Sequence, residues 1–145
     1  MNTEISSAKN SNGVNCLFCK IIAGEIPATK VYEDEHYLGF LDINPLNPGH
    51  TLVIPKKHYR WVWDDETIGK YMEACQRVAN AQRRAFDTEQ ISSLVFGEEV
   101  PHAHIWLIPR LPKDGHGGAI DLTNRKTFSR EEMMEFAEKI KTHLS

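Results

Sequence analysis

The stretch VPHAHIWLIP, residues 100–109, places two histidines and a tryptophan at alternate positions of a predicted β-strand. Side chains alternate along a strand, so His102, His104 and Trp106 share one face with Ile108, and the two imidazoles lie about 6–7 Å apart. The other face is apolar and should be core: Ala103, Ile105 and Leu107. From the residues alone, the two histidines could bind metal, act in chemistry, or be satisfied surface side chains.

Hydrophobic periodicity in the rest of the chain predicts an α+β domain, an antiparallel sheet meander with one long helix and a C-terminal helix. The predicted strands cover 29–34, 37–42, 50–56, 91–96 and 100–109. A helical turn or two is expected within 17–28, a long helix over about 66–86 and a final helix over 130–143. Ser129 and Glu132 have the spacing of a capping box before the last helix. QRR at 82–84 reads as a solvated helix face, and KDGHGG at 113–118 as a flap over a site.

Size and charge limit the possible functions. The 145 residues fit one domain, with a net charge of −3 that gives no basic field for nucleic acid. No apolar run approaches the about 20 residues of a membrane span, and the start of the chain lacks a signal sequence. We therefore expect a disordered N-terminal tail over 1–15, a domain over 16–145, a cytoplasmic location, and neither nucleic acid nor membrane as a partner.

Three cysteines occur, at positions 16, 19 and 75. Cys75 falls on the apolar face of the long helix and is predicted to be an inert core residue. Cys16 and Cys19 form a C-x-x-C pair, which could supply two of the four ligands of a structural zinc site. His58 and His102 are candidates for the other two, because each is predicted near a strand end. The alternative is a pair of reduced, half-buried thiols; a redox pair is disfavoured because no strand precedes the motif.

These residues resemble the histidine triad (HIT) superfamily of nucleotide hydrolases and transferases over roughly residues 16–112. The similarity rests on CLFCKIIAGEIPATKVYEDEHYLGFLDINPLNPGHTLVIPKKH (16–58) and EVPHAHIWLIPR (99–110). The resemblance implies the HIT fold, a purine nucleotide or nucleotide conjugate as ligand, and a homodimer. It also implies a structural Zn²⁺ in the bacterial zinc-containing branch, held by Cys16, Cys19, His58 and His102.

The resemblance further assigns roles within the site. His104 matches the nucleophile, which would attack the α-phosphate and form a nucleotidyl-histidine. His50, in the PGH segment, matches a histidine near the nucleophile and is counted with it as catalytic. Asp42 matches the acidic residue that holds the ribose hydroxyls. The apolar base pocket corresponds to Phe18, Ile21, Phe40 and Ile43.

Three departures gather at the phosphate end. Trp106 replaces the third histidine of the motif, and indole cannot transfer a proton at neutral pH. Glu99 occupies a position where the family carries a hydroxyl toward phosphate, so it must be protonated, turned away or paired, or serve the metal ligands instead. The connection before the last strand is short and lacks the asparagine that helps fix phosphates.

Two functions from different classes therefore compete. The first is a hydrolase acting on a phosphoramidate, phosphosulfate or dinucleoside polyphosphate through His104. The second is a zinc-stapled nucleotide-binding protein with little or no turnover, favoured by Trp106 and Glu99. A purely structural or interaction module would require that no nucleotide binds at all.

Overall fold

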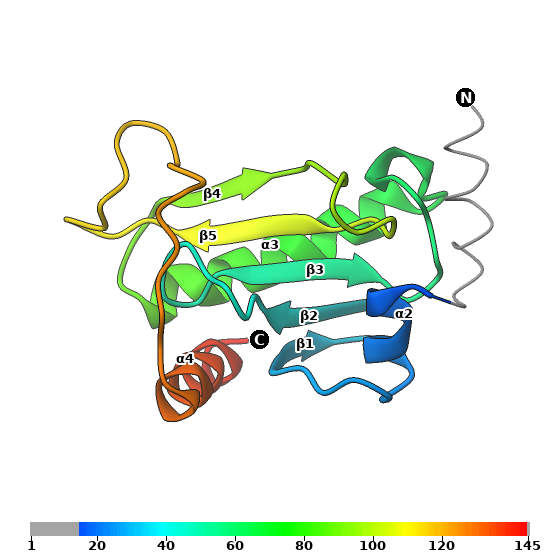
Figure 1. The fold of residues 1–145 in the computed structure, drawn as a ribbon, viewed down its shortest axis with the longest axis horizontal. Helices are drawn as coiled ribbons and strands as arrows, with labels where there is room; N and C mark the ends of the chain where they lie inside the picture. The colour runs from blue at the N-terminus through cyan, green and yellow to red at the C-terminus, as the bar shows by residue number, and fades with distance from the viewer. Residues whose placement is uncertain (1–14, 145) are drawn as a thin grey trace.

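The computed structural model describes residues 15–144, and within them five strands form one antiparallel sheet in the order β1-β2-β3-β5-β4 (Figure 1). The strands are β1 (Lys30–Glu33), β2 (Tyr37–Leu41), β3 (Thr51–Pro55), β4 (Ile91–Leu94) and β5 (Ile105–Pro109). The helices are α2 (Leu17–Ile22), α3 (Ile68–Ala85) and α4 (Arg130–Thr142), with a short 3-10 helix η1 (Val62–Asp64). The predicted α+β class is confirmed; the tail predicted over 1–15 lies, except for Asn15, outside the described residues.

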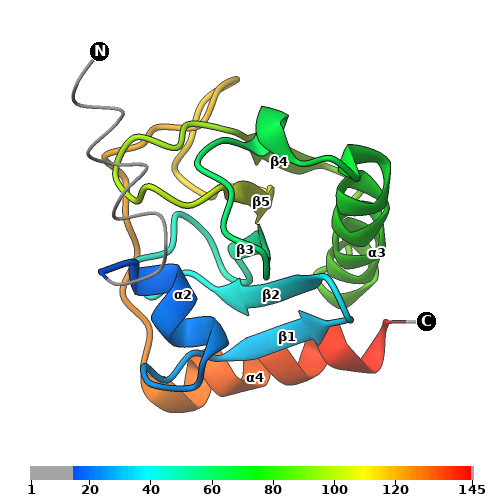
Figure 2. The same ribbon diagram turned by 90° about the vertical axis from the view of Figure 1, so that its right-hand side faces the viewer.

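The sheet is a meander only over its first three strands. α3 then carries the chain across one face to β4 at the edge, and β5 returns between β3 and β4. Figure 2 shows α3 on one side of the sheet and α2 on the other. β2, β3 and β5 are consequently buried on both faces.

Side-chain alternation divides the core into two layers. Leu52 and Ile54 of β3 pack with Trp106 and the α2 side, while Val53 packs toward α3. The apolar face predicted from the sequence is confirmed, since it joins the α3 layer: Ala103, Ile105 and Leu107. Cys75 is buried in the same layer, as predicted.

The prediction of a strand over 100–109 is wrong in its first half. β5 begins only at Ile105, so His102 and His104 precede it. The register pairs Val53 with Ile105, and extending it by two residues would place Ala103 opposite Pro55. Proline has no N–H to donate to a ladder. The Ala103 N–H donates instead to the Tyr59 carbonyl at 2.8 Å, which takes the chain off the sheet.

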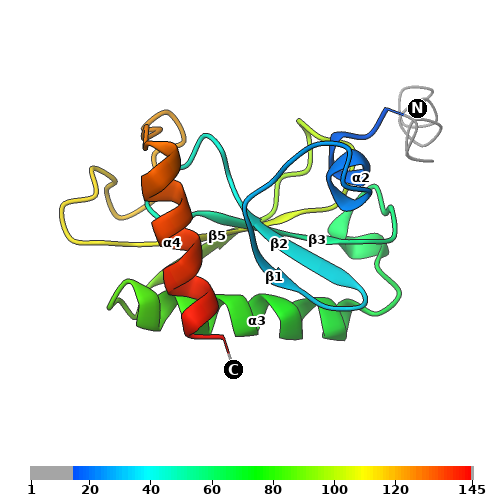
Figure 3. The same cartoon turned by 90° about the horizontal axis from the view of Figure 1, so that it is seen from below.

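The two longer helices end close to their predicted limits. α4 begins with the predicted capping box, since the Glu132 N–H donates to Ser129 Oγ and the Ser129 N–H to Glu132 Oε1. Figure 3 shows α4 running across α3, and its buried residues Ala137 and Ile140 pack with Ala81 of α3. Within residues 15–144, no helix is both long and apolar enough to cross a membrane.

The expectation of a solvated QRR face is wrong at Gln82, which is fully buried. Its amide nitrogen donates to the Gly49 carbonyl at 2.9 Å and the Leu107 carbonyl at 3.0 Å. These bonds fasten α3 to the sheet and to the turn that presents His50. The two arginines of the segment are exposed, as predicted.

Candidate functional site

Four potential metal ligands converge where α2 meets the ends of β3 and the segment before β5. One ligand atom from each of Cys16, Cys19, His58 and His102 lies within 4.8 Å of every other. His102 Nδ1 is 3.3 Å from Cys16 Sγ and 3.1 Å from His58 Nδ1, and Cys19 Sγ is 3.1 Å from His58 Nδ1. Tetrahedral zinc with bonds of about 2.0–2.3 Å requires ligand separations of this order. The residues predicted as ligands are therefore brought together.

The protonation states of the cluster residues are also compatible with binding of a metal cation. His102 Nε2 donates to the Pro55 carbonyl at 2.8 Å, which leaves the Nδ1 lone pair facing the cluster. Burial lowers the pKa of His102 to about 4, so the imidazole is neutral, as a metal ligand must be. Burial and the neighbouring Cys16 raise the pKa of Cys19 to about 12, so this thiol ionises at neutral pH only beside a cation. The four residues could hold a metal such as zinc.

A cavity of about 530 Å³ opens beside the cluster, between α2, β2 and the segments before β5 and α4. Eight residues predicted for nucleotide binding or catalysis line it: Phe18, Ile21, Phe40, Asp42, Ile43, Glu99, His104 and Trp106. The aromatic rings of Phe18 and Phe40 meet edge to face at 5.5 Å at the apolar end. Ile43 differs from the other apolar residues, because it is 92% exposed at the mouth. A ligand would have to cover it.

His104 is the buried imidazole of this cavity. Its Nδ1 lies 2.7 Å from the His102 carbonyl oxygen, which can only accept, so Nδ1 carries the proton and Nε2 keeps a free lone pair. Burial lowers the pKa of His104 below its usual value. The backbone of a cluster residue thus orients the neutral ring, and Nε2 is the nitrogen left for chemistry.

Asp42 and His50 lie close together at the end of β2. The Asn44 N–H donates to Asp42 Oδ1 at 2.8 Å. Burial raises the pKa of Asp42, although this backbone bond and Arg125 oppose the shift. His50 is fully buried and does not line the cavity. Its Nδ1 accepts the Leu46 N–H at 3.0 Å, so the proton sits on Nε2, 3.6 Å from Asp42 Oδ2.

Trp106 is enclosed by rings at the end of the cavity that the resemblance assigns to phosphate. Its indole lies 5.2 Å from the His50 ring and 5.4 Å from the Phe96 ring, and it is 7% exposed. Glu99 lines the cavity and is exposed. Within residues 15–144, no hydrogen bond joins Glu99 to His58 or His102, so the alternative that it steadies the metal ligands gains no support.

Among the lining residues that sequence reasoning missed, Leu122 and Arg125 come from the loop before α4. Residues 113–118, expected to form a flap over the site, do not line the cavity. Asp114 accepts the Arg110 Nε–H at 2.9 Å and the Asn47 amide at 2.9 Å. The later part of the same loop reaches the cavity. No periodicity or motif marks this part of the loop, so the sequence offered no signal for it.

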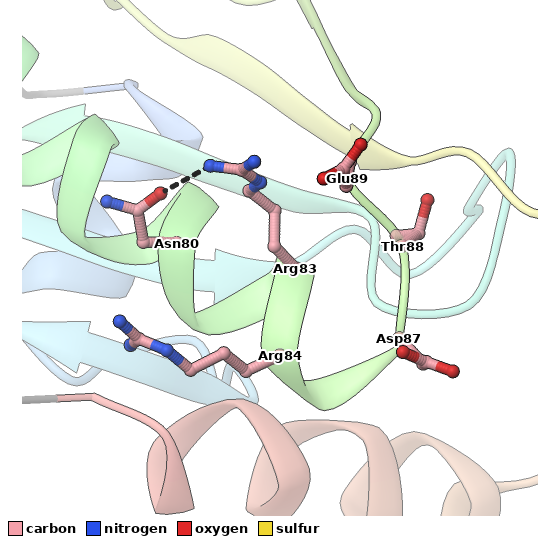
Figure 4. A pocket seen from close by; sticks show the side chains of 6 residues that line it. All are labelled: Asn80, Arg83, Arg84, Asp87, Thr88 and Glu89. Atoms are coloured by element: carbon pink, nitrogen blue, oxygen red, sulfur yellow. Dashed lines mark hydrogen bonds between the residues drawn. The ribbon is translucent and has the colours of Figure 1, made fainter.

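A second hollow of about 360 Å³ lies at the C-terminal end of α3 (Figure 4). It is lined by Asn80, Arg83, Arg84, Asp87, Thr88 and Glu89. Arg83 donates to Asn80 Oδ1 at 3.3 Å, while Arg84 extends along the helix away from Asp87. Neither histidine nor cysteine occurs among the described residues that line it. The cavity at His104 is therefore the candidate site.

Comparison with known proteins identifies the family of the chain. A family model described as the HIT domain matches residues 23–113. The protein hit of Bacillus subtilis is 41% identical over 138 residues, covering 90% of this chain and 95% of that protein. An adenosine 5′-monophosphoramidase of Saccharomyces cerevisiae is 36% identical over 123 residues, covering 83% and 77%. A Zn-bound histidine triad family protein from Mycobacterium smegmatis superimposes with a TM-score of 0.74 at 31% identity, covering 90% and 93%.

The fold is an antiparallel sheet with a Cys/His cluster beside a buried histidine. The sequence matches show which family has this arrangement. The chain belongs to the histidine triad family, as the resemblance implied. The family contains hydrolases, among them the yeast phosphoramidase.

Proposed function

We propose that the protein hydrolyses nucleotide conjugates by attack of His104 on the α-phosphate, with a purine nucleoside phosphoramidate, phosphosulfate or dinucleoside polyphosphate as substrate. The observation that carries the proposal is the 2.7 Å bond from His104 Nδ1 to the His102 carbonyl, which leaves Nε2 unprotonated in the cavity. A neutral, oriented imidazole is a competent nucleophile toward phosphorus. The phosphoramidase activity of the yeast relative supports the phosphoramidate member of this class.

The residues around His104 suggest a binding mode. The apolar end, with Phe18, Ile21 and Phe40, suits a purine base, and Ile43 would fold over it. Asp42, beside this end, offers a carboxylate oxygen to the ribose hydroxyls. His50 would act as a positioning residue, because it packs behind Trp106 and faces Asp42 rather than the cavity.

The reaction has two displacements. In the first, the Nε2 lone pair forms a bond to the α-phosphorus while the bond to the leaving group breaks, and the leaving group keeps the electron pair. An amine leaving group takes its proton from water, since the Trp106 indole has none to give at neutral pH. In the second, water attacks phosphorus and releases a proton to solvent. The N–P bond then breaks and its electron pair returns to Nε2.

The Cys/His cluster would hold a structural zinc ion in this protein, with Cys16, Cys19, His58 and His102 as ligands. Such an ion would supply a cross-link rather than chemistry, because all four positions belong to the protein and no position is left for substrate. The similar Zn-bound family structure from Mycobacterium smegmatis supports the choice of metal. The homodimer and the cytoplasmic location stay predictions.

Turnover tests the proposal. Purified parent protein, His104→Ala and the exposed control His36→Ala are assayed on adenosine and guanosine phosphoramidates and dinucleoside polyphosphates. We expect the parent and the control to release nucleoside monophosphate, and His104→Ala to lose about 10³-fold or more in rate. A nucleoside monophosphate released equally by all three proteins would overturn the role of His104.

The alternative is a zinc-stapled nucleotide-binding protein without turnover. It is favoured by Trp106 and Glu99, which leave the phosphate end without a proton donor and with an added carboxylate. Nucleotide binding by the parent and by His104→Ala, with no product from either on any substrate, would establish this alternative.

A further inference from the structure

The charges that line the cavity are unbalanced. Three carboxylates belong to the lining, from Asp42, Glu98 and Glu99. Among the described residues that line the cavity, Arg125 is the one lysine or arginine. A nucleotide brings at least one further negative charge beside His104, and in a partly desolvated site like charges repel strongly. A phosphoryl group that binds here would be stabilised by a cation. Arg125 lines this cavity, whereas Arg60 lines the smaller adjoining hollow that also contains His104.

The guanidinium of Arg125 lies between the two ends of the cavity. Its Nη1 donates to the Asn44 carbonyl at 2.7 Å and is 3.8 Å from Asp42 Oδ2. The guanidinium carbon sits 5.3 Å from the centre of the Trp106 ring. The group thus lies over the ring of the residue that replaces the third histidine, next to the carboxylate proposed for the ribose.

The backbone that carries Arg125 is held in place. The Lys126 N–H donates to the Pro45 carbonyl at 2.7 Å, and its Nζ donates to the Leu46 carbonyl at 2.7 Å and to Asn47 Oδ1 at 3.0 Å. His116 Nε2 adds a 3.0 Å contact to the same Leu46 carbonyl. These bonds fasten the loop before α4 to the 44–47 turn, so Arg125 is presented to the cavity by a fixed segment.

Most of the donors of Arg125 remain available. A guanidinium has five N–H groups, and the structure shows one hydrogen bond from this side chain, to Asn44. The 3.8 Å separation from Asp42 is an ion pair rather than a hydrogen bond. The side chain lines the cavity and is 27% exposed, so a ligand in the cavity can reach it. Planar paired donors match two phosphoryl oxygens.

We propose that Arg125 binds the phosphoryl oxygens of the nucleotide and sets the preference for nucleotide over nucleoside. The proposal rests on the proposed function, because it needs a nucleotide in the His104 cavity. Arg125 compensates for Glu99 and for the short connection before β5, where the phosphate contacts of the family are missing. The cation–π contact with Trp106 restrains the guanidinium and gives the tryptophan a role in phosphate recognition.

The test separates phosphate recognition from support of Asp42. Calorimetric titration gives the Kd of AMP and of adenosine, and of GMP and guanosine, for the parent, Arg125→Met and Arg125→Lys. Arg84→Met, an exposed arginine on α3 outside the cavity, is the matched control. Circular dichroism and the melting temperature show that each variant is folded.

We expect the parent and the control to bind the monophosphate about ten-fold or more tightly than the nucleoside. Arg125→Met should lose that ratio while its nucleoside affinity stays within about two-fold, and Arg125→Lys should keep part of it. An unchanged ratio in Arg125→Met, including the case in which both affinities fall together, would overturn the role of Arg125 and leave it a partner of Asp42. Failure of the parent to bind either ligand would overturn the proposed function and this inference with it.

Discussion

The two ends of the cavity are built differently. At the apolar end, Phe18 and Ile21 come from α2, and Phe40 comes from β2. At the end proposed for phosphate, Glu99, Trp106 and Arg125 come from three separate segments, and the guanidinium of Arg125 lies over the Trp106 ring. The first end depends on where one short helix is held. The second depends on individual side chains, with Trp106 in place of the third histidine of the motif and Arg125 proposed as the phosphate contact.

The helix at the apolar end is only six residues long. An isolated helix of that length is unstable in water, because its nucleation cost is not recovered. α2 is fixed because Cys16 is its N-cap, accepting the Cys19 N–H, and because both cysteines belong to the metal cluster. The comparison therefore teaches that base binding should depend on the cluster, whereas phosphate binding should depend on Trp106 and Arg125.

The largest effect is expected from loss of the cluster. Chelation of the parent, or Cys19→Ala, should lower stability by about 3 kcal/mol or more and the melting temperature by about 10 °C. Adenosine affinity should fall as well, because α2 no longer presents Phe18 and Ile21. Thermal melting with and without chelator, together with adenosine titration, measures both.

Cys75→Ala is the matched cysteine variant, since Cys75 lies in α3 and outside the cluster. Relative to the parent under the same condition, Cys75→Ala should lower the free energy of unfolding by the same amount with and without chelator, because its cluster is intact. Unchanged melting and unchanged adenosine binding after chelation of the parent would show that packing alone holds α2, and the contrast between the two ends would fail.

At the phosphate end we expect a smaller effect, and it is a gain in turnover rather than a loss of stability or affinity. Trp106→His restores a group that can transfer a proton to the leaving group. We expect the turnover of an amine phosphoramidate to rise by about ten- to a hundred-fold, within the usual range of general-acid help. Steady-state kinetics with a series of amines of rising pKa measures it, and the gain should be greatest for the poorest leaving group.

Trp106→Phe keeps an aromatic ring beside His50 and Phe96 but adds no proton donor, so it should show no gain. A gain of equal size in both variants would mean that the indole merely obstructs the site. The phosphate end would then differ from its relatives in space rather than in proton transfer.

Sequence reasoning reached the apolar end and the cluster more completely than the phosphate end, for a physical reason. The ligand and pocket residues lie in short, patterned segments: a C-x-x-C that opens a helix, and alternating strands. Such patterns translate directly into geometry. The cluster could be proposed from such patterns, whereas the predicted pocket residues came from the resemblance to the histidine triad family. The structure brings the four cluster residues together and places eight predicted residues in the cavity lining.

Arg125 could not be anticipated, because its hydrogen-bond partner Asn44 is 81 positions away and the intervening loop has no periodicity. The late start of β5 was missed because alternation continues through residues 100–104, while the ladder is ended by Pro55 on the neighbouring strand. Gln82 was assigned to solvent by its polarity, whereas three acceptors in the core were hidden in other segments: Gly49, Thr51 and Leu107.

The smallest effect concerns His50, which supports the phosphate end from behind Trp106. Burial lowers the pKa of His50 to about 3, below the value of about 6.5 for an unfolded chain. Between these values the unfolded state binds more protons, so stability falls as the pH falls. From pH 7 to pH 5 this one group should cost about 2 kcal/mol, measured by urea denaturation at each pH.

His50→Asn keeps an acceptor for the Leu46 N–H but cannot titrate, so its stability should fall less steeply with acidification. Histidines that titrate in both proteins cancel in this difference. His36→Gln, which alters an exposed ring, should retain the slope of the parent. Equal slopes for the parent and His50→Asn would mean that acid opens the structure around His50 and hydrates the ring. The phosphate end would then be the more mobile of the two, and Trp106 would lack a rigid support.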